Sequence, residues 1–119
     1  MQDADRGQPP LRPLTLDILI ALGEGAHHGY SLMRTLKEDG RFITPVHTGP
    51  LYRALKRLLD QGLVEERAGP PEGVADDARR SAYYTLSEQG REVLRAELER
   101  LDRLVRSGAR LGLAGGGPR

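Results

Sequence analysis

The sequence predicts a mainly helical α+β fold, a winged helix-turn-helix followed by a C-terminal dimerisation helix. Apolar residues recur at helical spacing in three short segments between residues 14 and 61. Two strand-like segments follow at 63–67 and 82–86, and a helix with heptad spacing closes the pattern. Three helices followed by a hairpin is the element order of a winged helix-turn-helix, with the third helix as the recognition helix and the hairpin as the wing.

The first two predicted helices are short and end near glycines. The first begins at Leu14, is expected to be capped by Thr15 or an adjacent residue, and stops at Gly23 and Gly25. The second runs from about residue 29 to residue 39 and ends at a glycine. The inner stripes are Leu16, Leu19, Ile20 and Leu22 in the first helix, and Leu32, Met33 and Leu36 in the second.

The third predicted helix spans residues 49 to 61 and has two distinct faces. Pro50 falls in its first turn, where a missing N–H breaks no hydrogen bond, and Gly62 follows it as a left-handed cap. The inner face is expected to hold Leu51, Leu55, Leu58 and Leu59, and the outer face carries Tyr52, Arg53, Lys56 and Arg57.

We expect this outer face to enter the major groove of DNA, where arginine reads guanine and lysine neutralises phosphate. Tyr52 is expected to reach a phosphate through its hydroxyl. Thr48 and the amide of Gly49 lie at the start of the helix, where free N–H groups favour a phosphate. The alternative is a solvated helix face, which is the usual meaning of such a run of charges.

The wing is predicted to have a long tip, because residues 68–81 are rich in turn-forming residues. Arg79 and Arg80 lie at the base of the returning strand and are candidates for contact with the DNA backbone or minor groove. The alternative is that they offset Asp76 and Asp77 within the loop.

The last predicted helix begins after Ser87, a good N-cap, and runs to about residue 108. Its heptad seam consists of Leu94, Leu98, Leu101 and Val105. We expect the seam to form a homodimer, because a twofold dimer presents two recognition helices about 34–36 Å apart. The alternative is packing onto the first helix of the same chain.

The expected organisation has four parts. Residues 1–13 form a flexible arm, 14–86 the winged helix-turn-helix, 87–108 the dimerisation helix and 109–119 a disordered tail. The 119 residues suffice for one compact domain, and the net charge of +1 means that any nucleic-acid contact must come from a local basic patch.

The composition excludes several classes of function. The absence of cysteine excludes disulfides, thiolate metal sites and cysteine nucleophiles, and no apolar run reaches the length of a membrane span. His27, His28 and His47 lack metal-binding spacing, and no catalytic motif is present, so we expect no cofactor and no enzymatic activity. The expected location is the cytoplasm.

Four segments resemble the PadR family of bacterial transcriptional regulators. They are LTLDILIALGEG (14–25), HGYSLMRTL (28–36), TGPLYRALKRLLDQGLVEE (48–66) and RRSAYYTLSEQGREVL (79–94). The resemblance implies a winged-helix domain, a single C-terminal dimerisation helix and repression by operator binding. Two features depart from the family pattern: the wing tip is long and acidic, and Pro50 stands where the family often has a small hydroxyl residue.

The sequence therefore predicts a homodimeric repressor that binds a pseudo-palindromic operator in double-stranded DNA. The resemblance leaves open release by a small-molecule effector. Some relatives stack flat compounds between subunits on tryptophan, and this chain has no Trp and one Phe. The alternative function is a winged-helix module for protein contact without DNA binding, which the acidic wing tip and the near-neutral net charge leave open.

Overall fold

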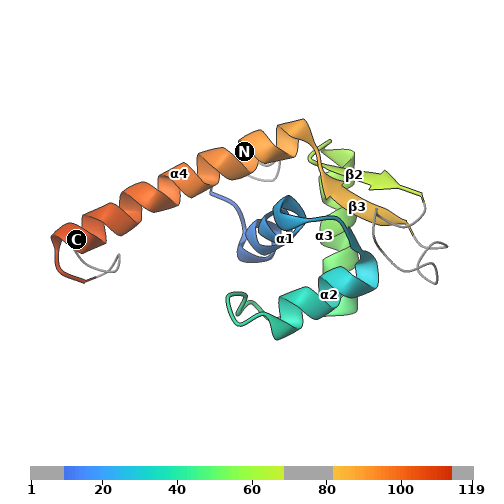
Figure 1. Ribbon diagram of the computed structural model, residues 1–119, viewed down its shortest axis with the longest axis horizontal. Coiled ribbons are helices and arrows are strands. Elements are labelled where there is room, and N and C mark those ends of the chain that lie inside the picture. Colours follow the sequence, from blue (N-terminus) through green and yellow to red (C-terminus); the bar gives the residue numbers. More distant parts are fainter. Residues whose placement is uncertain (1–9, 69–81, 114–119) are drawn as a thin grey trace.

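The computed structural model describes residues 10–68 and 82–113. Within them the predicted element order is confirmed, with one further strand (Figure 1). The elements are α1 (Pro13–Glu24), β1 (His27–His28), α2 (Gly29–Glu38), α3 (Thr48–Asp60), β2 (Val64–Arg67), β3 (Tyr83–Leu86) and α4 (Glu88–Arg110).

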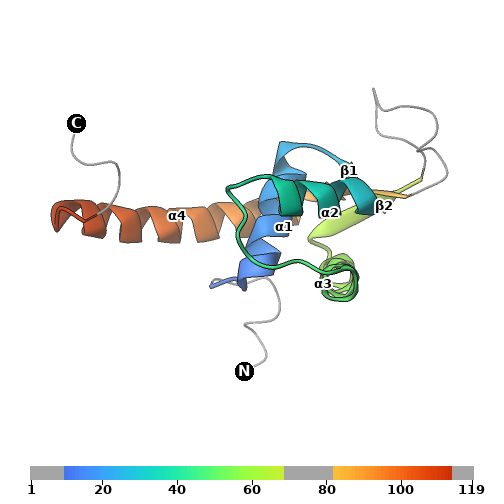
Figure 2. The ribbon, with the colours of Figure 1, turned by 90° about the horizontal axis from the view of Figure 1, so that it is seen from below.

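One core holds the winged helix together. Helix α1 packs against α2, α3, β3 and the first part of α4, so it lies at the centre of the domain (Figures 1 and 2). The fully buried apolar side chains come from α1, α2, α3 and the residue that precedes β2. They include Ile18, Leu19, Leu32, Leu51, Leu55, Leu58 and Leu63. The leucines predicted to line the inner sides of α1, α2 and α3 are therefore buried or half-buried, and Ala54 joins them on α3.

The sheet has three antiparallel strands in the order β1-β3-β2, where the sequence predicted a two-stranded hairpin. Strand β2 pairs with β3 from Val64 opposite Leu86 to Arg67 opposite Tyr83. The missed strand is β1, in which His27 pairs with Tyr84 and His28 with Tyr83. Two residues are too few to show an alternating pattern, so only the partner strand reveals it.

The start of α1 also differs from the prediction. The helix begins at Pro13 with Arg12 as its N-cap, and no side chain caps it, so Thr15 lies inside the first turn. Proline is suited to the first helical position because its N–H would have no partner there. Gly23 lies inside the helix rather than ending it, and a Cβ there would contact Leu86 and Leu94.

Helix α3 ends as predicted at a left-handed glycine. Gly62 has φ of +77° and follows the C-cap residue Gln61. The amide of Gly62 donates to the carbonyl of Leu59, and the amide of Leu63 donates to that of Leu58, both at 3.0 Å. This pair of bonds is a Schellman motif, which satisfies the last carbonyls of the helix and turns the chain into β2.

The end of α3 is hydrogen-bonded to the start of α4. The hydroxyl of Ser87 accepts from the amide of Gly90 at 2.9 Å, as predicted for an N-cap, and donates to the carbonyl of Gly62 at 2.7 Å. The amide of Ser87 donates to the carbonyl of Leu63 at 3.0 Å. These four residues, Gly62, Leu63, Ser87 and Gly90, form what we call the α3–α4 junction.

The connector between α2 and α3 is held by an arginine. Arg41 Nη1 lies 2.7 Å from Glu24 at the end of α1, and Arg41 Nη2 lies 2.8 Å from Asp39 at the end of α2. The guanidinium also stacks over the ring of Phe42, at 4.9 Å from its centroid. These contacts fix the chain that leads into α3.

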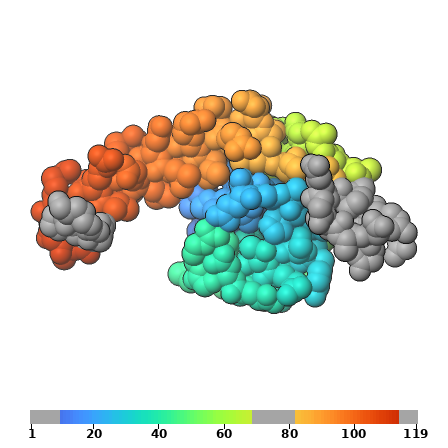
Figure 3. Space-filling view, viewed as in Figure 1, coloured from blue at the N-terminus to red at the C-terminus, as the bar shows by residue number. Residues whose placement is uncertain are grey.

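Helix α4 extends well beyond the winged helix. Its distal half projects from the body of the domain in Figures 1 and 3, and it runs to Arg110, two residues past the predicted end. A second Schellman motif closes it at Gly112, whose φ is +79°. No helix in the described ranges is long and apolar enough to cross a membrane.

Candidate nucleic-acid interface

Helix α3 presents its cationic side chains on the outside of the domain. Arg53, Lys56 and Arg57 are exposed, on the side opposite the buried leucines. Lys56 Nζ lies 3.7 Å from the carboxylate of Asp60 in a solvent-exposed pair, which contributes little to stability. Among residues 10–68 and 82–113, no carboxylate pairs with Arg53 or Arg57. Both guanidinium groups are therefore available to an external anion.

The start of α3 is open to solvent. The helix begins at Thr48, both Thr48 and Gly49 are exposed, and the N-cap residue His47 makes no side-chain cap bond. The first amides of a helix have no acceptor within it. A Cβ at Gly49 would lie 3.2 Å from Nη1 of Arg53, so the guanidinium folds back over the helix start. The positively charged guanidinium of Arg53 thus lies beside the free N–H groups of the helix start, an arrangement that attracts phosphate.

Tyr52 lies at the edge of the outer face, on the side nearest α2. Its side chain is 43% exposed, and its hydroxyl contacts Gly29 so closely that a Cβ there would overlap it. Gly29 is therefore required for the packing of Tyr52 between α3 and the start of α2. Phosphate contact by the Tyr52 hydroxyl stays a prediction.

The predicted wing contacts fall outside the described residues. Arg79 and Arg80 belong to the segment 69–81, and so do Asp76 and Asp77. The base of the wing is described: Arg67 at the end of β2 pairs with Glu65 at 3.1 Å.

The predicted dimerisation seam divides into two parts. Leu94 is 8% exposed and belongs to the chain's own core, so the alternative of packing within the chain applies to this residue. Leu98 and Val105 remain 43% and 46% exposed, and Leu101 is half-buried. Leu104, which lies beside the seam, is 56% exposed.

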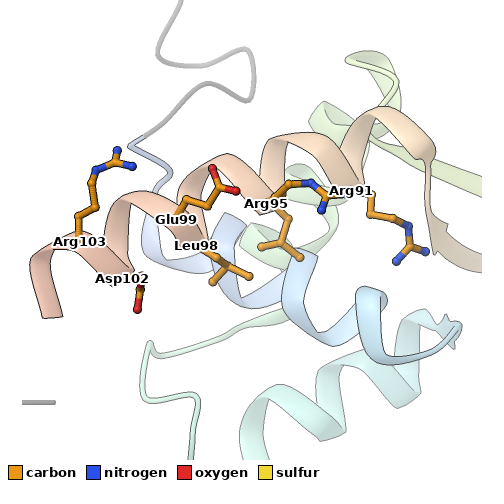
Figure 4. A pocket seen from close by; sticks show the side chains of 7 residues that line it. Arg91, Arg95, Leu98, Glu99, Asp102 and Arg103 are labelled. Atoms are coloured by element: carbon orange, nitrogen blue, oxygen red, sulfur yellow. The ribbon is translucent and has the colours of Figure 1, made fainter. Parts of the chain in front are cut away.

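A shallow hollow of about 650 Å³ runs along this part of α4. Figure 4 shows Arg91, Arg95 and Arg103 spread along the helix, with Leu98, Glu99 and Asp102 between them. The surface is thus apolar at its centre and carries charges of both signs at its margins.

Two of the histidines, His27 and His28, form structural hydrogen bonds near β1. Nδ1 of His27 lies 3.0 Å from the hydroxyl of Ser31, which itself donates to the carbonyl of His28. His27 must therefore be the donor in the first bond. Nδ1 of His28 donates to the carbonyl of Ala82 at 3.2 Å, and its ring meets Tyr83 edge-on. These bonds tie the start of α2 to β3.

No group of three potential ligands in the described ranges could hold a metal ion.

One buried charge was not predicted. Glu97 is 1% exposed, and its carboxylate accepts from Arg100 at 2.8 and 3.0 Å and from the amide of Leu11 at 3.1 Å. The hydrogen bonds from Arg100 lower the pKa of the Glu97 carboxyl. Glu97 thereby joins the segment before α1 to the middle of α4.

A winged helix-turn-helix with an exposed basic third helix defines a class of DNA-binding proteins. The model of the transcriptional regulator PadR-like family matches residues 18–96. The chain belongs to this family, whose members are transcription regulators rather than enzymes, as predicted. A search of curated protein sequences finds no match.

Solved structures agree with this assignment. Bacillus subtilis PadR in complex with operator DNA is 26% identical, with a TM-score of 0.60 over 73% of this chain and 47% of that one. A PadR family transcriptional regulator from Eggerthella lenta is 26% identical, with a TM-score of 0.63 over 82% and 80%. A transcriptional regulator from Clostridium thermocellum shares the fold at 20% identity, with a TM-score of 0.63 over 79% and 84%.

Proposed function

We propose that this protein is a homodimeric repressor that binds a pseudo-palindromic operator through α3. The observation that carries the proposal is the pair Arg53 and Arg57, exposed on the outer side of α3 with no carboxylate partner in the described ranges. The fold is shared with a regulator solved on operator DNA. Such a protein works in the cytoplasm, where the DNA is.

In this proposal the contacts divide by task. Arg53 and Lys56 lie near the centre of the outer face and reach base edges in the major groove. Thr48, Gly49 and Tyr52 contact phosphate at the helix start, and Arg57 contacts the backbone at the other flank. Arg79 and Arg80 bind the backbone or the minor groove from the wing.

The dimer forms through the uncovered side of α4. Leu98, Leu101 and Val105 supply its apolar centre, and a second α4 covers the hollow there. Leu94 supports this surface from the chain's own core. A hollow of about 650 Å³ is within the size range of ligand pockets, roughly 300–1,000 Å³, so the dimer interface is also where we place an effector that releases the DNA.

The proposal is tested by replacing both central cations. The double variant Arg53→Ala, Lys56→Ala is expected to lose at least about a hundredfold in operator affinity, because each base contact contributes about 1–3 kcal/mol. Mobility shifts with the chain's own promoter region measure the affinity, and size-exclusion chromatography with light scattering checks the dimer.

The matched control is Arg106→Ala, which removes an exposed arginine paired with Asp102 on α4 and should leave binding unchanged. Wild-type affinity in the double variant would rule out this face as the DNA contact. If the wild-type protein gives no shift even at low salt, the alternative of a protein-contact module is favoured instead.

A further inference from the structure

A second cationic hollow lies where the start of α1 meets the flank of α3. It has a volume of about 220 Å³ and is lined by Arg12, Leu14 and Thr15 from one side and by Pro50, Arg53 and Arg57 from the other. Three of these residues are arginines, and none of the lining residues within 10–68 and 82–113 is acidic. We call it the α1–α3 hollow.

Arg53 and Arg57 have no carboxylate partner in the described ranges, unlike several other arginines of the chain, such as Arg34, Arg41 and Arg100. Arg53 and Arg57 are one helical turn apart, and like charges at that spacing destabilise a helix by a few tenths of a kcal/mol. A bound anion between them would remove this repulsion.

The size and the polar groups of the α1–α3 hollow indicate which anion fits. At about 220 Å³ it is smaller than the roughly 300 Å³ at which drug-sized ligand pockets begin, but it can accept a phosphate group. The hydroxyl-bearing residue Thr15 lines it, and guanidinium groups bind phosphate oxygens in bidentate fashion. The amides in the first turn of α1 lack acceptors within the helix and add to the positive potential.

The position of the hollow relates it to DNA. Figure 2 shows α3 nearly end-on at the outer edge of the domain, and the first turn of α1 reaches toward the same edge. Arg53 belongs both to the outer face of α3 and to the hollow. A duplex with α3 in its major groove therefore has a backbone strand beside the start of α1.

We propose that the α1–α3 hollow holds one backbone phosphate of the operator, anchored by Arg12, Thr15 and Arg57, with Arg53 adding positive charge from the side that the hollow shares with the outer face of α3. This inference rests on the proposed DNA binding through α3 and extends the interface to a part of the chain outside the helix-turn-helix. A phosphate contact strengthens binding to every sequence equally, so Arg12 contributes affinity and register but no discrimination between sequences.

The test compares wild type with Arg12→Ala on an operator duplex and on a duplex of unrelated sequence, by fluorescence anisotropy between about 50 and 200 mM salt. Affinity for both duplexes should fall about tenfold for each subunit bound. The slope of log affinity against log salt concentration should also decrease by about one phosphate contact per subunit. Arg12→Lys keeps the charge and should keep most of the salt dependence. Arg106→Ala serves as the control for loss of an exposed arginine.

Each other outcome has a distinct meaning. If wild type binds the operator and Arg12→Ala matches it in affinity and salt dependence, the phosphate contact is wrong while the proposed function stands. If wild type does not bind, the proposed function itself fails. A fall in affinity for the operator alone would overturn the inference, because it would make Arg12 a reader of sequence.

Two further measurements address folding and the source of the phosphate. A large fall in the thermal midpoint of both Arg12 variants would overturn the inference by assigning the residue to stability. Inorganic phosphate, added at constant ionic strength, would stabilise wild type but not Arg12→Ala if the hollow served a free phosphate ligand. That result combined with unchanged DNA binding would also contradict the proposal.

Discussion

At the scale of single residues, Glu97 is a charged side chain that the sequence pattern would place on the surface and that the fold buries. Along α4 it is one of several glutamates interspersed with arginines, and nothing in its spacing separates it from the others. Its burial arises because the segment before α1 crosses α4, and the amide of Leu11 needs an acceptor there. Such a contact over 86 positions depends on the tertiary fold and is invisible to periodicity.

The lowered pKa of Glu97 predicts a pH dependence of stability. A carboxyl whose pKa is lower in the folded state contributes stability above its unfolded pKa and loses it as pH falls through the folded value. Wild type should therefore lose stability on acidification below the ordinary range of glutamate. Glu97→Gln should be less stable at neutral pH and should lose less than wild type on acidification.

Urea unfolding followed by circular dichroism, from about pH 7 to about pH 3, measures this difference. Glu99→Gln is the matched control, because Glu99 is an exposed glutamate on the same helix. Parallel pH profiles for wild type and Glu97→Gln would contradict the assignment.

At the scale of elements, the junction of α3 and α4 depends on a glycine. Gly90 is buried, and a Cβ there would overlap the backbone carbonyl oxygen of Leu63 and lie 2.9 Å from Cδ1 of Leu86. Because the obstacle is backbone, it cannot move aside as a flexible side chain could. The sequence showed Ser87 as an N-cap, but the bond that its hydroxyl donates to the carbonyl of Gly62 follows only from the packing of the two helices.

We therefore predict that Gly90→Ala destabilises the protein by about 1–3 kcal/mol, as expected when a well-packed site is overfilled. Urea unfolding measures the free energy of unfolding. Gly40→Ala is the control, because a Cβ at that position meets no atom within 4 Å, and its effect should stay within about 0.5 kcal/mol. Equal free energies of unfolding in the two variants would show that α4 can shift away from Leu63 without loss of stability.

The elements that could be predicted are those that carry their own periodic signal. Helix α3 was predicted to within a residue at each end, because Pro50, Gly62 and the leucine spacing all agree. Strand β1 was missed because its pairing partners in β3 lie 55 and 57 positions away along the chain. The outward position of Arg53 and Lys56 follows from the helical wheel, whereas the contact of Tyr52 with Gly29 and the lining of the α1–α3 hollow depend on helix packing.

At the scale of the whole molecule, α4 has more apolar surface than its own chain covers. Leu94 is buried, but the exposed side chains Leu98, Leu104 and Val105 follow it along the projecting half of the helix. An exposed apolar stripe of this kind marks an interaction surface in soluble proteins. A second copy of the chain is the partner that a pseudo-palindromic operator requires.

We predict that the double variant Leu98→Asp, Val105→Asp weakens the dimer at least about thirtyfold, since truncating a hot-spot residue at the centre of an interface costs about 2 kcal/mol or more. Analytical ultracentrifugation measures the dimer dissociation constant. Operator affinity should fall with it, while far-ultraviolet circular dichroism stays unchanged. Arg106→Ala is the control, and an unaltered dimer in the double variant would place the interface elsewhere.

The α3–α4 junction has a mechanical consequence for the proposed dimer. Two hydrogen bonds from Ser87 and the close approach of Gly90 to Leu63 make the end of α3 and the start of α4 move as one body. The 23 residues of α4 span about 34 Å, so α4 is a lever with a recognition helix fixed at one end. A tilt of about 6° over that length displaces an end by about 3.4 Å, which is the rise of one base pair. In the proposed dimer, the angle at which the two α4 helices cross would therefore set the spacing of the operator half-sites, through residues of α4 that do not touch DNA.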